Sequence, residues 1–162
     1  MRRTLILSGI IVSLFSGAFS EAYEFRGYTW GQSLERTRRR LERRDEIVSY
    51  NKESSTLVYS GFFYGEECKV SLLFTPESGE LAGIALVWAD DTAKDNILAD
   101  LSRKYGEPLK PGMKARDVEY YLWKSPTDPN DRIALIIDPK AMVLGYYGGD
   151  FYEKYRQEAG EE

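Results

Sequence analysis

The chain has 162 residues, of which 22 are basic and 26 acidic, and it carries a formal net charge of −4 and no histidine. The acidic excess disfavours nucleic acids and anionic lipids as general partners. The lack of histidine excludes histidine-based serine or cysteine hydrolases and histidine-ligated metal sites. The length is sufficient for one domain with a hydrophobic core.

At the N-terminus, the sequence has the three parts of a secretory signal peptide. A short basic start precedes the apolar segment Leu5 to Phe15, and small residues follow it. These small residues suit cleavage after Ser20 or after Ala22. An uncleaved anchor is the alternative, but the uncharged run from Thr4 to Ser20 is barely long enough to cross a bilayer. We therefore assign residues 1–20 to a signal peptide and predict a periplasmic or secreted protein with no stable membrane anchor.

In chain order, the first half of the mature chain predicts a helix and three strands. Ser33 is the expected N-cap of the helix, because its hydroxyl can accept a hydrogen bond from the first-turn amides. Asn51 to Ser55 is expected to be a loop, and Thr56 to Tyr64 the first strand. Lys69 to Phe74 and Leu81 to Trp88 then form an antiparallel hairpin, because two β-prone runs flank a short turn with proline and glycine.

Cys68 is the single cysteine of the chain and directly precedes this hairpin. One thiol forms no disulfide within the chain, so packing alone must stabilise an exported fold. Cys68 is in register with Val70, Leu72 and Phe74 on one face of the predicted strand, where a buried cysteine behaves as a small hydrophobic residue. A disulfide between two chains stays open as the alternative.

The second half follows the same order. A helix from Ala93 to Tyr105 is expected to end at Gly106, because glycine suits the left-handed C-cap. Leu109 to Ala115 is expected to connect this helix to three further strands. These strands are Asp117 to Lys124, Ile133 to Ile137 and Met142 to Tyr147, and a tail helix follows over residues 151–158.

The matching order and spacing of the halves predict a single α+β domain over residues 21–162. Its pseudo-repeats span about 30–90 and 91–150, and each consists of one helix and three strands. Strands that follow one another as hairpins pair antiparallel, and the helices must cover an apolar face. We therefore predict an antiparallel sheet of about six strands, built from two helix-plus-three-strand repeats, with the helices packed on one face.

Several short stretches resemble one known family. They are Trp30-Gly31-Gln32-Ser33, Leu57-Val58-Tyr59, Leu72-Leu73-Phe74 and Gly79-Glu80-Leu81 in the first half, and Tyr105-Gly106-Glu107-Pro108, Leu122-Trp123 and Ile133-Ala134-Leu135 in the second. Each half resembles the small outer-membrane barrel-assembly lipoproteins (SmpA/OmlA-like), and the tandem copy is similar to the β-lactamase inhibitor protein architecture. The chain lacks that family's lipidated cysteine and the Gly-x-Pro after its first helix. The resemblance implies contact with another protein rather than catalysis.

Carboxylates are the remaining candidates for catalysis or metal binding. Asp90, Asp91 and Asp95 could supply the acid pair of a glycosidase. They lie at the start of a predicted helix, where aspartates commonly cap the helix and favour its dipole. Oxygen-bearing side chains between Asp128 and Asp131 could ligate calcium, but their spacing is more typical of a turn. We predict no enzymatic activity, no cofactor and no metal site.

The first helix is rich in arginine. Its arginines are Arg36, Arg38, Arg39, Arg40, Arg43 and Arg44. Glu35 with Arg39, and Arg38 with Glu42, are spaced four apart and can form surface ion pairs worth about 0.2–0.5 kcal/mol each. The favoured interpretation is a solvated, salt-bridged surface. A basic patch that docks an acidic partner is the alternative.

Tyrosines on the predicted strands provide the positive indication of a binding surface. Successive strand side chains point to opposite faces, so one tyrosine of Tyr120-Tyr121 and one of Tyr146-Tyr147 is expected to point away from the helices. The candidate binding residues are Tyr121, Tyr147, Trp123 and Tyr59. We predict an exported, non-enzymatic interaction domain whose partner is another protein of the cell envelope. The alternative is a glycan or small-ligand binding domain that uses an aromatic sheet face.

Overall fold

A computed structural model describes residues 27–44, 46, 48–109, 113–115, 117–126 and 128–160. The predicted signal peptide and both predicted cleavage sites lie outside these residues. Helix α1 spans Leu34–Glu42, α2 spans Lys94–Tyr105 and α3 spans Gly149–Ala159. The strands are β1 (Ser49–Asn51), β2 (Thr56–Phe63), β3 (Glu66–Phe74), β4 (Leu81–Trp88), β5 (Met113–Ala115), β6 (Val118–Lys124), β7 (Arg132–Asp138) and β8 (Ala141–Tyr147).

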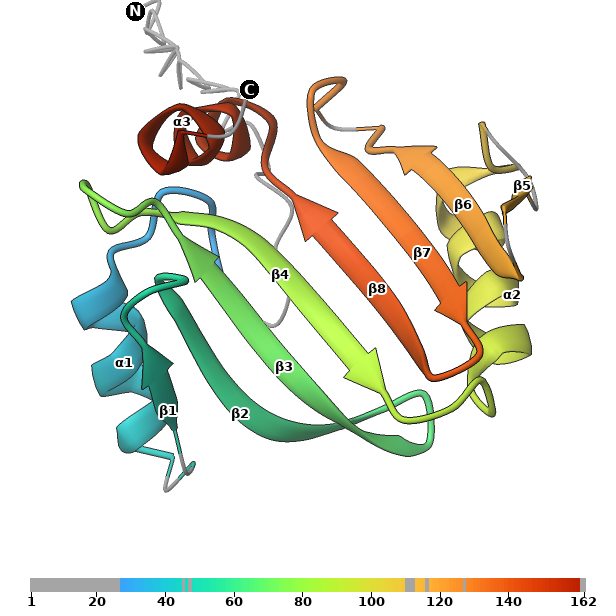
Figure 1. Cartoon of the computed structure of the whole chain (residues 1–162), viewed down its shortest axis with the longest axis horizontal. Coiled ribbons are helices and arrows are strands. Elements are labelled where there is room, and N and C mark those ends of the chain that lie inside the picture. Colours follow the sequence, from blue (N-terminus) through green and yellow to red (C-terminus); the bar gives the residue numbers. More distant parts are fainter. Residues whose placement is uncertain are drawn as a thin grey trace, which may run out of the picture.

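The strands form one eight-stranded sheet in the order β1-β2-β3-β4-β8-β7-β6-β5. Each neighbouring pair is antiparallel, and β4 pairs with β8 at the centre of the sheet. Figure 1 shows α1 beside the β1 end of the sheet, α2 behind its β6–β7 side and α3 across the upper end of the strands. The β4–β8 pair therefore joins the two halves of the chain into a single layer.

The predicted fold class is wrong. Instead of about six strands from two helix-plus-three-strand repeats, the described part of the chain contains eight strands, together with a helix over Gly149–Ala159 where the tail helix was expected over residues 151–158. The additional strands, β1 and β5, have three residues each and form the two edges of the sheet. Segments this short carry no hydrophobic period, so the sequence indicates a loop at Asn51 and a connector over Leu109 to Ala115. The helices also do not all share one face, because tyrosines of α3 lie beside Ser71 and Ala85, whereas α1 and α2 contribute to the core on the other face.

One face of the sheet carries the hydrophobic core, and we call it the inner face. Its buried side chains alternate along each strand. They are Leu57 and Tyr59 on β2, Cys68, Val70, Leu72 and Phe74 on β3, Ile84, Leu86 and Trp88 on β4, Met142, Leu144 and Tyr146 on β8, Ile133, Leu135 and Ile137 on β7, and Trp123 on β6. Leu41 of α1 and Ile97 and Leu101 of α2 belong to the same cluster, so these two helices cover the inner face. Cys68 is 4% exposed, which confirms its predicted burial.

The helix ends follow from local sequence. The Ser33 hydroxyl accepts a hydrogen bond from the Arg36 amide at 3.3 Å, as expected for the N-cap of α1. Gly106 ends α2 with a φ of 78°, a backbone conformation that glycine adopts without strain. Helix α3 begins at Gly149, directly after the central strand β8. The chain therefore passes from the middle of the sheet onto its second face.

Candidate binding face

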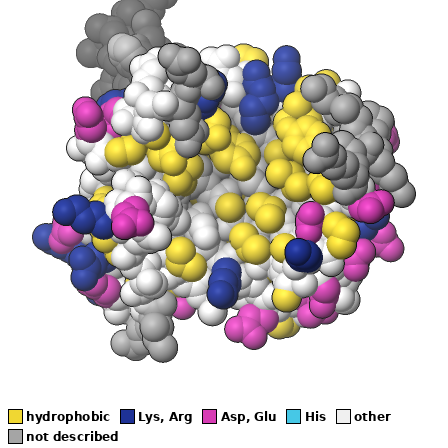
Figure 2. Space-filling view, in the orientation of Figure 1, with side chains coloured by type: hydrophobic (Ala, Val, Ile, Leu, Met, Phe, Trp, Pro, Cys, Tyr) yellow, Lys and Arg dark blue, Asp and Glu magenta, His cyan; other side chains and the backbone are white. Residues whose placement is uncertain are grey.

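The second face of the sheet, which we call the outer face, has no described helix across its centre (Figure 1). The strand register assigns to it Val58 of β2, Lys69, Ser71 and Leu73 of β3, Gly83, Ala85 and Val87 of β4, Val143, Gly145 and Tyr147 of β8, Arg132, Ala134 and Ile136 of β7, and Tyr120, Leu122 and Lys124 of β6. Most of its apolar side chains are partly exposed, whereas those of the inner face are buried. Figure 2 shows hydrophobic side chains gathered on this face around a hollow.

The hollow has a floor of small residues. Four of them lie side by side on the central strands, and we call them the floor: Ser71, Ala85, Gly145 and Ala134. Val58 and Leu122 extend this row on either side. Small side chains leave the middle of the sheet lower than its surroundings, so a group from a partner can approach the backbone closely.

Three tyrosines form one side of the hollow, and we call them the tyrosine wall: Tyr147 of β8 and Tyr152 and Tyr155 of α3. The ring centres of Tyr147 and Tyr152 are 4.7 Å apart, and those of Tyr152 and Tyr155 are 5.9 Å apart with nearly parallel planes. The wall and part of the floor enclose about 360 Å³. A second cavity of about 220 Å³, lined by Arg132, adjoins it because both contact Tyr147 and Tyr152.

Gly145 is required for the position of Tyr147. A Cβ atom added at Gly145 would lie 2.5 Å from the Tyr147 hydroxyl oxygen, so the tyrosine lies across the glycine. Burial raises the pKa of the Tyr147 hydroxyl, and the phenols of Tyr152 and Tyr120 raise it further. The Tyr147 hydroxyl is therefore neutral at physiological pH.

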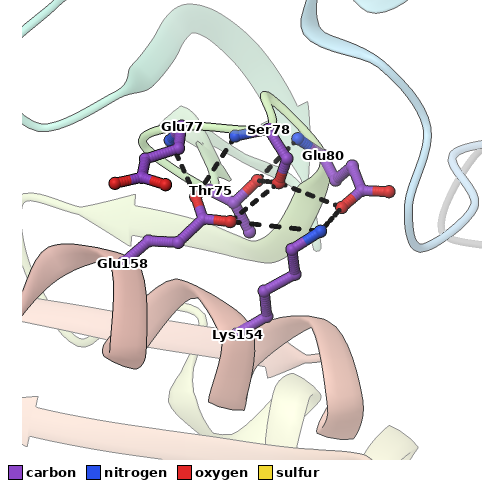
Figure 3. A network of polar contacts seen from close by, with 6 residues as sticks. All are labelled: Thr75, Glu77, Ser78, Glu80, Lys154 and Glu158. Carbon is purple, nitrogen blue, oxygen red and sulfur yellow. Dashed lines mark hydrogen bonds and ion pairs between the residues drawn. The ribbon is translucent and has the colours of Figure 1, made fainter.

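The C-terminal half of α3 is fixed by a polar network on the β3–β4 turn (Figure 3). The Glu158 carboxylate accepts hydrogen bonds from the amides of Glu77 at 2.7 Å and Ser78 at 3.2 Å, and from the Ser78 hydroxyl at 3.0 Å. Lys154 donates to Glu80 at 2.5 Å and lies 4.0 Å from Glu158. Although burial alone would raise the pKa of Glu158, these donors lower it, so the carboxylate stays ionised.

The N-terminal end of α3 is fixed by Asp131, the residue directly before β7. Its carboxylate accepts hydrogen bonds from the Trp30 indole at 3.0 Å and from the Gly149 amide at 2.9 Å. Burial raises the pKa of Asp131, while these two donors partly offset the effect. Both ends of α3 are thus tied to other elements, and these contacts fix the position of the tyrosine wall.

The structure brings only one of the predicted binding residues to the outer face, namely Tyr147. Tyr59, Tyr121 and Trp123 lie on the inner face. The Tyr59 hydroxyl is 3.3 Å from the Tyr28 hydroxyl, the Tyr121 ring stacks on Trp123, and the Trp123 indole donates to the Gly106 carbonyl. These contacts hold the fold together, so the three residues do not belong to the candidate binding face.

Sequence reasoning missed Tyr120, Tyr152 and Tyr155. Strand alternation pairs Tyr120 with Leu122 and Tyr121 with Trp123, but both pairs are apolar, so the pattern did not indicate which pair faces the helices. The tyrosines of α3 belong to the site only because the helix folds back over the sheet. No local sequence signal indicates that contact.

The acidic residues considered for catalysis are exposed, and those considered for calcium lie in a turn. Asp90 lies exposed in the turn before α2, where its carboxylate accepts the Thr92 amide. Asp131 is engaged by Trp30 and Gly149, and the Asp128 carboxylate accepts the Asn130 amide, as in a turn. Within the described ranges, no three cysteine or carboxylate side chains lie close enough together to hold a metal ion.

Two further results concern the class of protein. Among the helices that the structure describes, none has the length and apolar character needed to cross a membrane. The resemblance to the barrel-assembly lipoproteins stays a prediction from the residues alone. No family model matches the chain, and neither a curated protein nor a solved structure matches it.

Proposed function

We propose that the chain is a non-enzymatic interaction domain whose outer face binds a segment of another protein. The observation that carries this proposal is the partly exposed apolar surface on the four central strands. Partly exposed Val87, Val143 and Ile136 adjoin the floor in neighbouring strands. A contiguous apolar surface of this kind on a soluble domain commonly marks a contact with another macromolecule.

The shape and chemistry of the outer face favour a protein partner. The floor admits an apolar side chain from the partner, and the tyrosine wall provides contact area with little rotamer entropy to lose. Lys124 lies directly opposite Arg132 on the neighbouring strand, so this end of the face carries two basic residues in a chain with net negative charge. A carboxylate of the partner would be favourable at this end of the face.

The proposed partner is another protein of the cell envelope. This part of the proposal rests on the predicted signal peptide, which would deliver the chain to the periplasm or outside the cell. An apolar outer face that stays partly exposed in the free domain would then be covered on assembly with the partner.

Site-specific photo-crosslinking in the native host tests the proposal. A photoreactive amino acid is placed at Val143 or Leu122 on the outer face, and at Asn96 of α2 or Arg39 of α1 as exposed control positions. The expected result is one crosslinked product of the same mass from both outer-face positions and none from the controls. Products shared by all four positions, or none from the outer face, would contradict the proposal. A product of twice the mass of the chain would indicate that the outer face binds a second copy of the chain and not another protein.

A glycan is the second candidate ligand, and the nearly parallel rings of Tyr152 and Tyr155 favour it. Aromatic rings side by side can stack on the apolar faces of successive sugar rings. Titration with soluble cell-wall fragments, followed by NMR of the tyrosine rings, distinguishes the two candidates. Glycan binding predicts shifts of the wall tyrosines that are lost in Tyr155→Ala, with no crosslinked protein in the experiment above.

A further inference from the structure

Helix α1 carries its arginines on two different stripes. On one stripe, Arg38 pairs with Glu42 at 2.9 Å and Arg39 pairs with Glu35 at 2.8 Å. The other stripe lines a solvent-open groove of about 600 Å³, which we call the arginine groove. It is lined by Arg36 and Arg40 of α1, by Arg43 and Arg44 at and just beyond its C-terminal end, and by Gly27, Thr29 and Gln32 of the preceding segment. Both acidic residues of α1, Glu35 and Glu42, therefore pair with the first stripe, and neither lines the arginine groove.

One guanidinium of the arginine groove is held in a fixed position. Arg40 donates a hydrogen bond to the Gly27 carbonyl, and its guanidinium carbon lies 5.3 Å from the ring centre of the buried Tyr28. A Cβ atom at Gly27 would lie 2.5 Å from an Arg40 nitrogen, so the glycine makes room for the close approach. A cation over an aromatic face is favourable, so this site is partly organised without a ligand.

No ion pair joins the other arginines of the groove, Arg36, Arg43 and Arg44, to any carboxylate that the structure describes. Like charges spaced four apart on a helix repel, and this applies to Arg36 with Arg40. The chain as a whole is negative, so the concentration of positive charge here is local and not a general property of the surface.

We propose that the arginine groove binds a small anion that carries two or more phosphate groups. Guanidinium forks match the geometry of phosphate oxygens, and charge-assisted hydrogen bonds to them are strong. The groove is lined by four arginines, with Arg36 and Arg40 one turn apart on α1 and Arg43 and Arg44 at and just beyond its end. Linked phosphates present oxygens to more of these guanidinium groups at once than a single phosphate does. The groove contains no residue of the outer face, so this proposal stands independently of the proposed function.

Calorimetric titration of the purified, folded chain with inorganic pyrophosphate tests the proposal. The variant Arg36→Gln/Arg44→Gln removes two charges from the groove. Its matched control, Arg38→Gln/Arg39→Gln, removes two charges from the paired stripe of the same helix. Pyrophosphate is expected to bind the groove variant about tenfold more weakly or worse, and the control less than about threefold more weakly, than the unaltered chain. Thermal unfolding confirms that both variants fold.

Several outcomes would overturn the proposal. Equal weakening in both variants would indicate a general response to net charge. Orthophosphate that binds as tightly as pyrophosphate at the same ionic strength would exclude the requirement for linked phosphates. No binding of pyrophosphate, including the case in which only vesicles with anionic lipid are bound, would show that the groove does not take a free anion.

Discussion

The two faces of the sheet use the same strands for different purposes. On the inner face, the side chains of the central strands are almost completely buried under α1 and α2. On the outer face, the intervening side chains are small or partly exposed, and α3 covers only one end. Burial of apolar area is the main stabilising term in folding, so one face supplies most of the stability. The other face is then free to keep a hollow that a tightly packed core would not tolerate.

The largest expected effect is a difference in stability loss between two adjacent leucines that lie on opposite faces of the sheet. Leu72 is fully buried on the inner face, and Leu73 is partly exposed on the outer face. Leu72→Ala leaves a cavity in the core and is expected to lower the free energy of unfolding by about 3 kcal/mol. Leu73→Ala loses less buried area and is expected to cost about 1 kcal/mol. Urea unfolding of both variants measures the difference, and equal losses would contradict the assignment of the faces.

The next largest effect concerns Asp131, whose carboxylate binds the Trp30 indole and the first amide of α3. Asp131→Ala removes the acceptor for the Trp30 indole and the Gly149 amide. A buried donor left without an acceptor costs about 1–3 kcal/mol. The expected loss is therefore about 2 kcal/mol, measured by urea unfolding near neutral pH. A loss as small as that of Leu73→Ala would show that water replaces the carboxylate.

The titration of Asp131 also predicts how its contribution to stability changes with pH. Because burial raises its pKa in the folded state, the protonated form is favoured by folding. Its stabilising contribution is present below the unfolded pKa, near 4, and is lost as the pH rises through the higher folded pKa. Asp131→Asn abolishes this titration. The stability of the wild type relative to this variant should be greater at about pH 3.5 than at about pH 7, and the opposite trend would refute the raised pKa.

A smaller effect is expected where α3 is attached to the β3–β4 turn. Glu158→Ala removes the acceptor of the Glu77 and Ser78 amides but no core contact. The free energy of global unfolding should change little. The amides of α3 should exchange with deuterium faster than in the wild type, whereas those of β4 and β8 should keep their wild-type rates. Glu153→Ala on the same helix is the control, because Glu153 is exposed and belongs to no part of this network. Equal exchange in both variants would mean that the network does not anchor α3.

The sequence predicted the inner face better than the outer one, for a physical reason. Alternation of Cys68, Leu72 and Phe74 is strong because burial demands it, and it located the core of β3. The edge strands were missed because three residues carry no period. On β6 both alternating sets are apolar, so the sequence does not indicate that Tyr120, and not Tyr121, faces outward. The Glu158 contacts join residues about 80 positions apart, and only the folded chain reveals them.

The smallest expected effect on stability belongs to the residue that shapes the outer face most directly. In Gly145→Ala, the new methyl group meets the Tyr147 ring at 2.5–2.7 Å, and the ring must move away from the floor. Replacing glycine in a strand stabilises by restricting the unfolded chain, by about 0.4–1 kcal/mol, and this offsets the lost ring contacts. The net change in the free energy of unfolding should therefore be close to zero.

The displaced ring should nevertheless be visible in its titration. Burial raises the pKa of Tyr147 in the wild type, so a ring moved into solvent should titrate at lower pH, nearer the usual value for a phenol. NMR of ring-labelled tyrosine measures this, and Tyr147→Phe assigns the signal because only that resonance disappears. If the titration of Tyr147 stays unchanged while signals of the floor shift, the backbone has moved instead of the ring. The hollow would then be a property of the strands and not of the tyrosine that lies over Gly145.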